Sequence, residues 1–279
     1  MKIFLTGATG FIGKNFCAAA LKAGHFIYAV SRKKRKKKHK NIKWLHGNFD
    51  SKWTKELKKS DILVHLAASG TIENTPKEIY KVNVFNSTNL LKNAIKSNLK
   101  KWLIISTSSE YGIRRDKNFF KFSVNSNRLP DDDYGLSKAI FSDIVTQLSK
   151  KFKCKARIMR IFAVYGKGEN PNRLYPSLIR ASRKGVNFLV KNPFETRDFT
   201  SVNYVTDILM DSLDFKKRSF KNNQVWHISE NNPQLIKNFA KKIWKNKKGK
   251  GKLIFKKNSE VRFNHISDKK SIWQLNEKN

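Results

Sequence analysis

A glycine-rich turn at the start of the chain sets the strongest constraint on the fold. Residues 2–6 (KIFLT) are predicted as a buried strand, and TGATGFIG leads directly from them into an apolar-periodic segment. The turn places glycines at Gly7, Gly10 and Gly13. Such a turn needs positions without Cβ, and the free N–H groups that open the following helix can bind a pyrophosphate. We predict a dinucleotide-binding turn; a purely structural turn is the alternative.

Strands and helices alternate after this turn. Further strands are predicted at 25–30, 42–46, 61–69, 101–109 and 156–166, with long helices at 78–97 and 134–151. Strands joined by helical crossovers form a parallel sheet that is covered on both faces. The predicted fold class is therefore α/β, with a doubly wound, Rossmann-like parallel sheet as a dinucleotide-binding domain over residues 1–166.

The alternation weakens after residue 166. Helices at 173–184 and 233–245 are predicted beside extended segments at 186–190, 196–203 and 252–256. We interpret residues 167–279 as a smaller C-terminal α+β lobe that binds the substrate. The two parts are expected to interleave, with 196–210 as a segment that could return to the first.

Positive charge dominates the composition: 59 Lys and Arg against 21 Asp and Glu give a formal net charge of +38. Of the basic residues, 13 are Arg. Lys, Asn, Ile and Phe all have AT-rich codons, so a compositional background explains the charge without a partner. A nucleic-acid or anionic-surface binder is the alternative. We expect no nucleic acid and no membrane as partner, and we interpret the nine lysines within 241–257 as a solvated helix face and turn.

The content of hydrophobic and aromatic residues, glycine, proline and cysteine excludes several classes of protein. Hydrophobic residues at 39% and aromatic residues at 12%, with 13 Gly and 6 Pro, exclude a wholly disordered or collagen-like chain. No apolar stretch is long enough to predict a transmembrane helix. The N-terminus is a poor secretory signal, and Cys17 and Cys154 cannot form a disulfide framework. A reducing, cytoplasmic location is expected.

The end of the second predicted strand indicates which dinucleotide would bind. An acidic residue there would accept a hydrogen bond from the ribose 2′-OH of NAD. The sequence instead has Ser31, Arg32 and Lys33. A 2′-phosphate suits one hydroxyl and two cations, so NADP(H) is preferred and NAD(H) remains possible. The alternatives are an Arg32 that stacks on adenine and a basic tract for nuclear localisation or nucleic acid.

A tyrosine and a lysine four residues apart are the candidate catalytic pair. Tyr134 and Lys138 share one face of the helix predicted at 134–151. A free phenol has a pKa near 10, and a neighbouring ammonium is expected to lower it into a range useful for acid–base work. The lysine could also hold the nicotinamide ribose. The segment ISTSSEYG, residues 105–112, adds hydroxyls at a strand end that could polarise a carbonyl.

Taken together, these motifs resemble the extended short-chain dehydrogenase/reductase family, in its NAD(P)-dependent nucleotide-sugar epimerase, dehydratase and reductase branch. The resemblance covers essentially the whole chain. It rests on the order and spacing of TGATGFIG, DILVHLAA, VNV around Asn83, STSSEYG, YGLSK, RIFAVYGKGE, RLYPSLI, RDFTSV and VRFNHISDKK.

The resemblance implies roles for particular residues. Thr107 matches the family's catalytic Ser/Thr, Tyr134 its acid/base and Lys138 the modulator of that tyrosine. The implied cofactor-binding residues are Gly7, Gly10, Phe11, Ile12, Gly13, Ser31, Arg32, Lys33, Asn48, Phe49, Leu66, Ala67, Ala68, Tyr134, Lys138, Phe162 and Val164. Substrate would bind Ser108, Ser109, Arg173, Arg197 and Arg262, each Arg having a surface ion pair as the alternative. No metal is implied. A homodimer is expected, formed through the helices at 78–97 and 134–151.

The chain also departs from the family pattern. Ser108 and Ser109 stand where 4,6-dehydratases have an Asp–Glu pair, so dehydration by that mechanism is not expected. Ala163 replaces an Asn that is common in UDP-sugar epimerases, and Asn203 replaces a frequent acidic residue. The epimerases usually also keep an acidic residue that holds NAD tightly, and Ser31-Arg32-Lys33 lacks one.

The leading hypothesis is NADPH-dependent reduction of a nucleotide-linked 4-keto sugar, commonly a 6-deoxy sugar, to the 4-hydroxy sugar. It resembles the 4-ketoreductases that make deoxyhexoses for surface polysaccharide. The first alternative is an NAD(P)-dependent nucleotide-sugar 4-epimerase. A second, of another class, is a catalytically inactive NADP-binding or RNA-associated protein.

Overall fold

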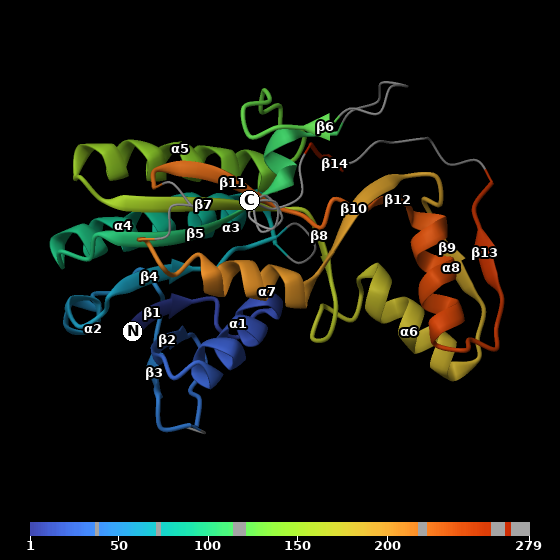
Figure 1. Cartoon of the computed structure of the whole chain (residues 1–279), viewed down its shortest axis with the longest axis horizontal. Helices are drawn as coiled ribbons and strands as arrows, with labels where there is room; N and C mark the ends of the chain where they lie inside the picture. The colour runs from blue at the N-terminus through green and yellow to red at the C-terminus, as the bar shows by residue number, and fades with distance from the viewer. Residues whose placement is uncertain (37–38, 71–73, 114–120, 217–221, 258–265, 269–279) are drawn as a thin grey trace, which may run out of the picture.

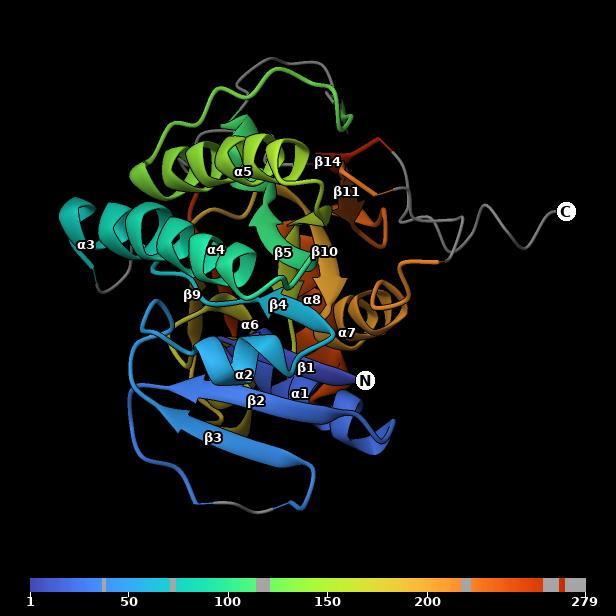
Figure 2. The ribbon, with the colours of Figure 1, turned by 90° about the vertical axis from the view of Figure 1, so that its left-hand side faces the viewer.

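A seven-stranded parallel sheet forms the centre of the protein, seen here in a computed structural model. The structure describes residues 1–279 except 37–38, 71–73, 114–120, 217–221, 258–265 and 269–279. The strands are paired in the order β11-β7-β5-β4-β1-β2-β3. Figure 2 shows β5, β4, β1, β2 and β3 following one another across the sheet. The strands of this sheet are β1 (Lys2–Thr6), β2 (Phe26–Ser31), β3 (Ile42–His46), β4 (Ile62–His65), β5 (Lys101–Thr107), β7 (Lys155–Ile161) and β11 (Gln224–Ile228). The predicted α/β, Rossmann-like fold is confirmed.

Helices cover both faces of this sheet, as Figure 1 shows. On one face lie α1 (Phe11–Lys22) and α7 (Val202–Asp211). On the other lie α2 (Thr54–Lys58), α4 (Ser87–Lys96) and α5 (Asp133–Lys151). Neighbouring residues of β1 supply both cores, because side chains alternate along a strand: Ile3 faces one cluster and Phe4 the other. Full burial of a side chain of this size stabilises the fold by about 1.5–3 kcal/mol.

The long helix predicted at 78–97 is built from three parts. They are α3 (Pro76–Tyr80), a π-helical segment (Lys81–Asn86) and α4. Asn83 lies within the π-helical segment, and its side chain is buried. Its Oδ1 accepts from the Ser69 N–H (2.7 Å), while its Nδ2 donates to Ser69 O (2.9 Å) and to Ser137 Oγ (3.0 Å). These bonds tie the loop after β4 to α5.

The C-terminal half crosses between the sheet and a smaller lobe. The lobe contains α6 (Leu174–Lys184) and α8 (Ile236–Asn246), with the strands β8 (Ala163–Tyr165), β10 (Thr196–Ser201), β12 (Pro233–Leu235), β9 (Phe188–Val190) and β13 (Leu253–Phe255). Its core includes Phe199 stacked on Phe239, with ring centroids 3.8 Å apart. Between the lobe's segments, α7 and β11 return to the main sheet. The remaining pair is β6 (Lys121–Phe122) with β14 (Ile266–Ser267).

The sequence prediction missed α2, α7 and β11, and also the short strands β6, β12 and β14. β12 occupies the start of the segment 233–245 that was predicted to be helical. Residues 196–203 were predicted as extended, but the chain turns helical at α7 because Ser201 caps it: Ser201 Oγ accepts from the Tyr204 N–H (3.3 Å). Within the described parts of the chain, no helix combines the length and the apolar character needed to cross a bilayer.

Candidate active site

The glycine-rich turn joins β1 to α1 at the carboxyl edge of the sheet. Gly7 has a φ of +73°, and a Cβ there would lie 2.6 Å from the backbone of Leu66 and Ala67. A Cβ on Gly13 would overlap the carbonyl oxygen of Gly7. Both positions therefore need glycine. Gly10 caps α1 and leaves the first N–H groups of the helix facing the edge of the sheet.

A cavity of about 500 Å³ opens beside this turn. It lies where the carboxyl ends of β1, β2 and β4 meet, which is where dinucleotides bind to sheets of this topology. The predicted cofactor residues that line it are Gly7, Gly10, Ser31, Arg32, Asn48, Phe49, Leu66, Ala67 and Ala68. The cavity therefore lies where the sequence predicted that a dinucleotide would bind.

The rim of this cavity at β2 is basic, and its three predicted residues behave differently. Ser31 Oγ donates to Lys33 O (2.8 Å) and accepts from the Lys33 N–H (3.3 Å), so a local turn occupies the hydroxyl. Arg32 is exposed and lines the cavity. Lys33 is exposed on the loop that follows, outside the lining. Arg32 is therefore the cation best placed to meet a phosphate at this end.

A second cavity, of about 550 Å³, lies beside the amino end of α1 and brings the candidate catalytic residues together. Its lining comes from the end of β5, the start of α5, β8 and the smaller lobe. The predicted site residues in it are Phe11, Ile12, Thr107, Ser108, Ser109, Tyr134, Phe162, Val164, Arg173 and Arg197. Arg262 lies outside the described residues.

Tyr134 stands in the first turn of α5, opposite the end of β5. Asp132 caps this helix, its Oδ1 accepting from the Gly135 N–H (2.6 Å). Gly135 allows a close approach, since a Cβ there would overlap the carbonyl oxygen of Ser109. Burial raises the pKa of the Tyr134 phenol to about 12, against the opposing effects of the Arg173 charge and a hydrogen bond with Thr107.

Lys138 lies one turn further along α5 and is buried. Its Nζ donates to Ile105 O on β5 (2.7 Å). Burial lowers the pKa of its ammonium to about 8, and the nearby Glu110 carboxylate partly opposes this. The sequence predicted that this ammonium would lower the pKa of Tyr134. The structure shows the pKa of Tyr134 raised instead, because burial outweighs the charges around the phenol.

Thr107 ends β5 and caps the short helix η2 (Ser108–Tyr111). Its Oγ1 accepts from the Ser109 N–H (3.1 Å) and donates to Ser109 Oγ (3.2 Å). The hydroxyls of Thr107, Ser108 and Ser109 thus line the same cavity wall as Tyr134. This arrangement offers several hydrogen-bond donors to one oxygen of a ligand, beside a phenol that keeps its proton at neutral pH.

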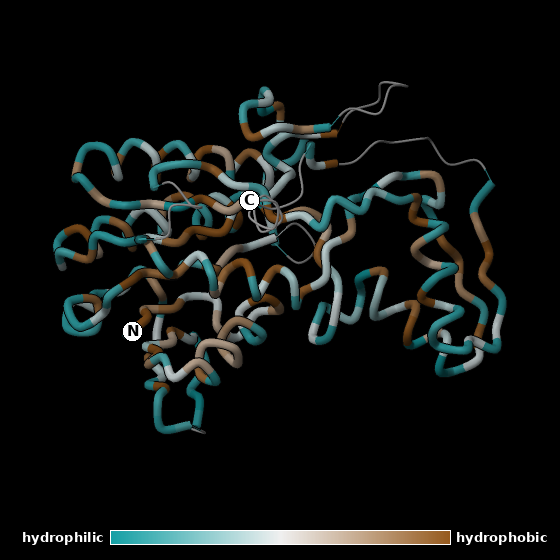
Figure 3. Tube along the Cα trace, viewed as in Figure 1, coloured by the Kyte–Doolittle hydropathy of each residue, from teal (hydrophilic) through white to brown (hydrophobic). Residues whose placement is uncertain are grey.

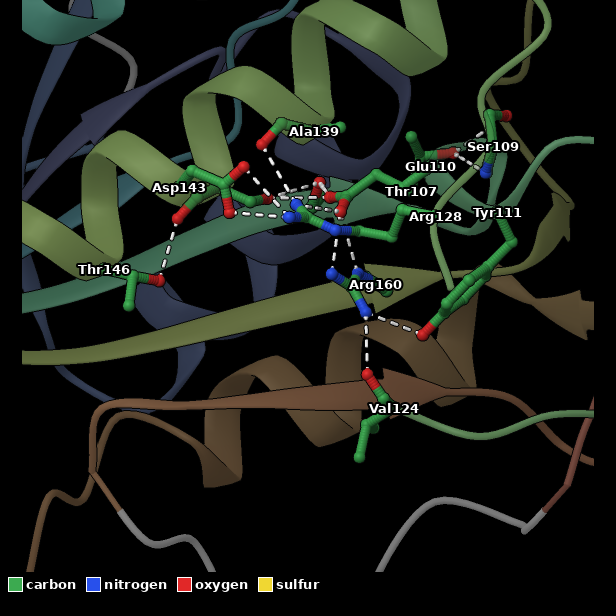
Figure 4. A network of polar contacts seen from close by, with 12 residues as sticks. Thr107, Ser109, Glu110, Tyr111, Val124, Arg128, Ala139, Asp143, Thr146 and Arg160 are labelled. Carbon is green, nitrogen blue, oxygen red and sulfur yellow. Dashed lines mark hydrogen bonds and ion pairs between the residues drawn. The ribbon is translucent and has the colours of Figure 1, made fainter. Parts of the chain in front are cut away.

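Behind this wall a buried carboxylate, Glu110, organises a polar network (Figure 4). It is fully buried and forms ion pairs with Arg160 (2.8 Å) and Arg128 (3.4 Å). Ser142 Oγ also donates to it (2.7 Å), as does Ser106 Oγ. The network links η2, β7 and α5, so it fixes the segment that carries Thr107.

The network continues through Arg160 to the last strand of the sheet. Arg160 donates to the Tyr111 hydroxyl (2.7 Å) and to Val124 O (3.1 Å). Tyr111 in turn bonds His227 Nε2 (2.6 Å), and His227 Nδ1 lies 3.1 Å from Ser267 Oγ. Burial lowers the pKa of the His227 imidazole to about 3, so this histidine is neutral, with one ring nitrogen as donor and the other as acceptor.

The substrate side of the cavity carries two of the predicted arginines. Arg173 caps α6 and is exposed. Arg197 lies on β10, where its Nε donates to Glu195 Oε1 (2.6 Å), so the ion pair considered as the alternative does form. Arg197 lines the cavity as well, and its side chain is 36% exposed.

Sequence reasoning assigned no role to Glu110, Arg160 or Glu169. All three lie within segments that carried the resemblance, but nothing in their spacing separates them from solvated charges. Glu169 lines the cavity, and its Oε2 is buried without a hydrogen-bond partner among the described residues. Burial raises the pKa of this carboxyl to about 7. A backbone hydrogen bond from Gly166 and the charges of Arg173 and Arg197 act in the opposite direction and lower it in part.

Comparisons with known proteins agree with this geometry. A family model described as the NAD dependent epimerase/dehydratase family matches residues 3–226. The chain is 29% identical over 240 residues to UDP-glucose 4-epimerase from Vibrio cholerae, covering 82% of this chain and 70% of that protein. It is 32% identical over 216 residues to GDP-6-deoxy-D-talose 4-dehydrogenase from Aggregatibacter actinomycetemcomitans, covering 75% and 69%.

Solved structures share the fold. One is a UDP-N-acetylglucosamine 4-epimerase from Methanobrevibacter ruminantium M1 in complex with UDP-N-acetylmuramic acid. It superposes with a TM-score of 0.84 at 20% identity, covering 96% of this chain and 89% of that chain. A UDP-glucuronic acid 4-epimerase from Bacillus cereus gives a TM-score of 0.83 at 22% identity, covering 96% and 90%.

Proposed function

The chain belongs to the NAD-dependent epimerase/dehydratase family, and from that premise we propose that it reduces a nucleotide-linked 4-keto sugar to the 4-hydroxy sugar with NADPH. It is an enzyme of the oxidoreductase type that these relatives represent. The observation that carries the choice of reduction is the basic rim at β2. Arg32 lines the cofactor cavity where an acidic residue would favour NAD, and an exchangeable NADPH suits net reduction.

The groups in the second cavity fit this reaction. NADPH would supply a hydride to the carbonyl carbon at C4 of the sugar. Tyr134 holds a proton at neutral pH, because the pKa of its phenol is about 12, and it would donate that proton to the alkoxide that forms. Thr107 would donate a hydrogen bond to the same oxygen once its hydroxyl turns away from Ser109 Oγ. The products are NADP⁺ and the hydroxyl sugar, and solvent returns the proton to Tyr134.

The remaining site residues have supporting roles in this proposal. Lys138, which is buried and is not among the described lining residues of either cavity, would bind the nicotinamide ribose through its ammonium group. Arg173 and Arg197, both on the cavity, would bind the diphosphate of the substrate. The relative named GDP-6-deoxy-D-talose 4-dehydrogenase favours a 6-deoxy sugar that reacts at C4. Ser108 and Ser109 lack the acid pair needed for dehydration, which favours a substrate that already carries the keto group.

A homodimer is the assembly we propose, formed by the face of α4 and α5 that points away from the sheet. Phe85, in the π-helical segment before α4, is 66% exposed, and Leu136 on α5 is 42% exposed. Burying two such side chains against a second copy would stabilise the pair. The oligomeric state can be measured by light scattering on the wild-type chain and on Phe85→Ser.

The direct test is incubation with NADPH and a nucleotide-linked 4-keto-6-deoxy sugar. We expect one NADPH oxidised for each sugar reduced, and no turnover by Tyr134→Phe, which should still bind NADPH. Interconversion of UDP-glucose and UDP-galactose without net cofactor consumption would instead establish the 4-epimerase, the candidate that the Vibrio cholerae relative favours. A chain that binds NADPH but turns over neither substrate would contradict both of these reactions.

Cofactor preference is tested separately, by Arg32→Ala. Losing one charge-assisted hydrogen-bonding partner of a phosphate costs about 1.5–3 kcal/mol, so NADPH should bind about tenfold more weakly or worse. NADH binding should stay nearly unchanged, because NADH has no 2′-phosphate. Equal weakening of both dinucleotides would mean that Arg32 contacts the shared adenosine rather than a 2′-phosphate.

A further inference from the structure

A two-stranded ribbon closes the end of the smaller lobe that points away from the main sheet (Figure 1). The ribbon pairs β9 with β13 in parallel, and Leu189 stands opposite Ile254 in the register. Side chains alternate along strands, so their neighbours point inward, and Phe188, Val190, Leu253 and Phe255 pack against the core of α6 and α8. Leu189 and Ile254 therefore point outward, where they are 50% and 47% exposed.

Lysines bracket this aliphatic pair. Lys252 and Lys256 lie two residues before and after Ile254, and Lys191 lies two residues after Leu189, so all three are expected on the outward side. Each of them is exposed. We call this surface the ribbon face: Leu189, Lys191, Lys252, Ile254 and Lys256. Figure 3 shows β13 as a hydrophobic strand between hydrophilic ends.

The surroundings of the ribbon face are uniformly basic. Residues 236–257, which span α8 and β13, contain ten lysines and no acidic residue. Lysines of α8 such as Lys241, Lys242 and Lys245 are exposed, while its apolar residues face the core. From the sequence, the lysines within 241–257 were interpreted as a solvated helix face and turn. The structure adds an exposed aliphatic pair in the middle of the charge, which solvation alone does not explain.

We propose that the ribbon face docks on an anionic lipid membrane. Leu189 and Ile254 would enter the boundary between headgroups and acyl chains, and the surrounding ammonium groups would bind headgroup phosphates. Each lysine near such a surface contributes about 1 kcal/mol, and apolar burial adds to it. Docking of this kind needs no spanning helix. It departs from the expectation, drawn from the sequence, that no membrane is a partner.

Nucleic acid fits the ribbon face less well. Single-stranded nucleic acids stack their bases on aromatic rings or on Arg, and the exposed pair here is aliphatic. The rings of Phe188 and Phe255 belong to the inner side of the ribbon. The outward charges are all Lys, which meets a phosphate as a point charge without the planar fork of Arg.

The ribbon face is separate from the walls of both cavities. Neither cavity counts any of the five ribbon-face residues among its described lining residues. Substitutions in the ribbon face are therefore expected to leave NADPH binding unchanged. The proposal does not depend on which sugar nucleotide reacts, so its failure and the failure of the proposed reaction can be told apart.

The test is co-sedimentation of the full chain with vesicles of phosphatidylcholine alone or in an equimolar mixture with phosphatidylglycerol. We expect binding to the mixed vesicles only, weakening as salt rises. Leu189→Ser with Ile254→Ser keeps the charge and should lower the partition coefficient about tenfold. Lys252→Gln with Lys256→Gln should lower it about fivefold per lysine.

The matched control is Lys55→Gln with Lys58→Gln, which removes the same charge from exposed positions on α2, outside the smaller lobe. This pair should bind the mixed vesicles like the wild-type chain. The proposal is wrong if the control loses as much binding as the ribbon lysines, or if the aliphatic double variant binds unchanged. Retention by single-stranded RNA but not by vesicles would also overturn it. Circular dichroism and NADPH binding show whether each variant is folded. If the double serine variant does not fold, the vesicle binding of Lys252→Gln with Lys256→Gln tests the proposal.

Discussion

Burial sets the protonation of the two residues at the centre of the site. The pKa of Tyr134 rises to about 12 and that of Lys138 falls to about 8, so each group is pushed toward its neutral form. The spacing of these residues placed them on one helix, but spacing does not reveal desolvation. A phenol that keeps its proton suits the donor role in a reduction, where the oxygen of the product gains a proton.

A pH effect is expected from Glu169. The pKa of its carboxyl is about 7, so raising the pH through this value adds a negative charge to the second cavity. An anionic diphosphate should then bind more weakly, by about tenfold between roughly pH 6 and pH 8. UDP-glucose is the suitable probe, because its diester phosphates do not titrate there. Binding measured by calorimetry should lose this slope in Glu169→Gln, and a slope that persists in the variant would assign it to another group.

Stability should depend strongly on Glu110. Glu110→Gln leaves the buried Arg160 without its carboxylate, and breaking a buried pair in this way costs about 3–5 kcal/mol. Asp143→Asn is the matched control, because Asp143 forms an ion pair with Arg128 and its side chain is 61% exposed. Exposed ion pairs contribute about 0–1 kcal/mol to the free energy of unfolding. Urea unfolding of the two variants checks the difference. Equal losses would contradict a special role for the buried carboxylate.

At the scale of elements, predictability followed the strength of the local pattern. The apolar strands of the sheet and the amphipathic helices could be placed from the sequence, and with them the turn, Thr107 and Tyr134. The sequence allowed for a return of 196–210 to the first domain but missed the helix α7, because its Ser201 cap lay inside an extended pattern. β11 has an ordinary strand composition, and its place at the sheet edge is decided by pairing with β7. The Glu110 network joins segments that are far apart in the sequence, so a local sequence pattern cannot predict it.

Close packing between β1 and α1 can be tested at Gly13. Gly13→Ala would push a methyl group into the carbonyl of Gly7, so α1 must shift from the sheet edge, at a cost of about 1–3 kcal/mol. NADPH binding should be lost or strongly weakened, as followed by fluorescence titration. Ala18→Ser, on the exposed side of the same helix, should stay within about 0.5 kcal/mol of the wild-type chain. Full NADPH binding by Gly13→Ala would show that the turn is not part of the cofactor site.

At the scale of the whole molecule, the charge of +38 acts against the compact state. Like charges repel across the surface, and salt screens this repulsion. We expect the melting temperature to rise as sodium chloride increases from low to physiological concentration, by about 2–4 °C for each kcal/mol of repulsion removed. Differential scanning fluorimetry measures it, with sucrose as the uncharged control. A melting temperature that stays flat in salt would mean that the lysines are spaced widely enough not to interact.

The path of the chain between sheet and lobe limits how this enzyme can be rearranged. The chain leaves the sheet after β7, returns through α7 and β11, and leaves again to form α8 and β13. The lobe is therefore not one continuous segment that could be exchanged as a unit. Grafting the specificity of a relative would require two inserts, one before α7 and one after β11, which must pack against each other as Phe199 and Phe239 do. A new substrate specificity is therefore expected to arise by exchange of side chains around the cavity. The chain crossings between the sheet and the lobe would stay unchanged.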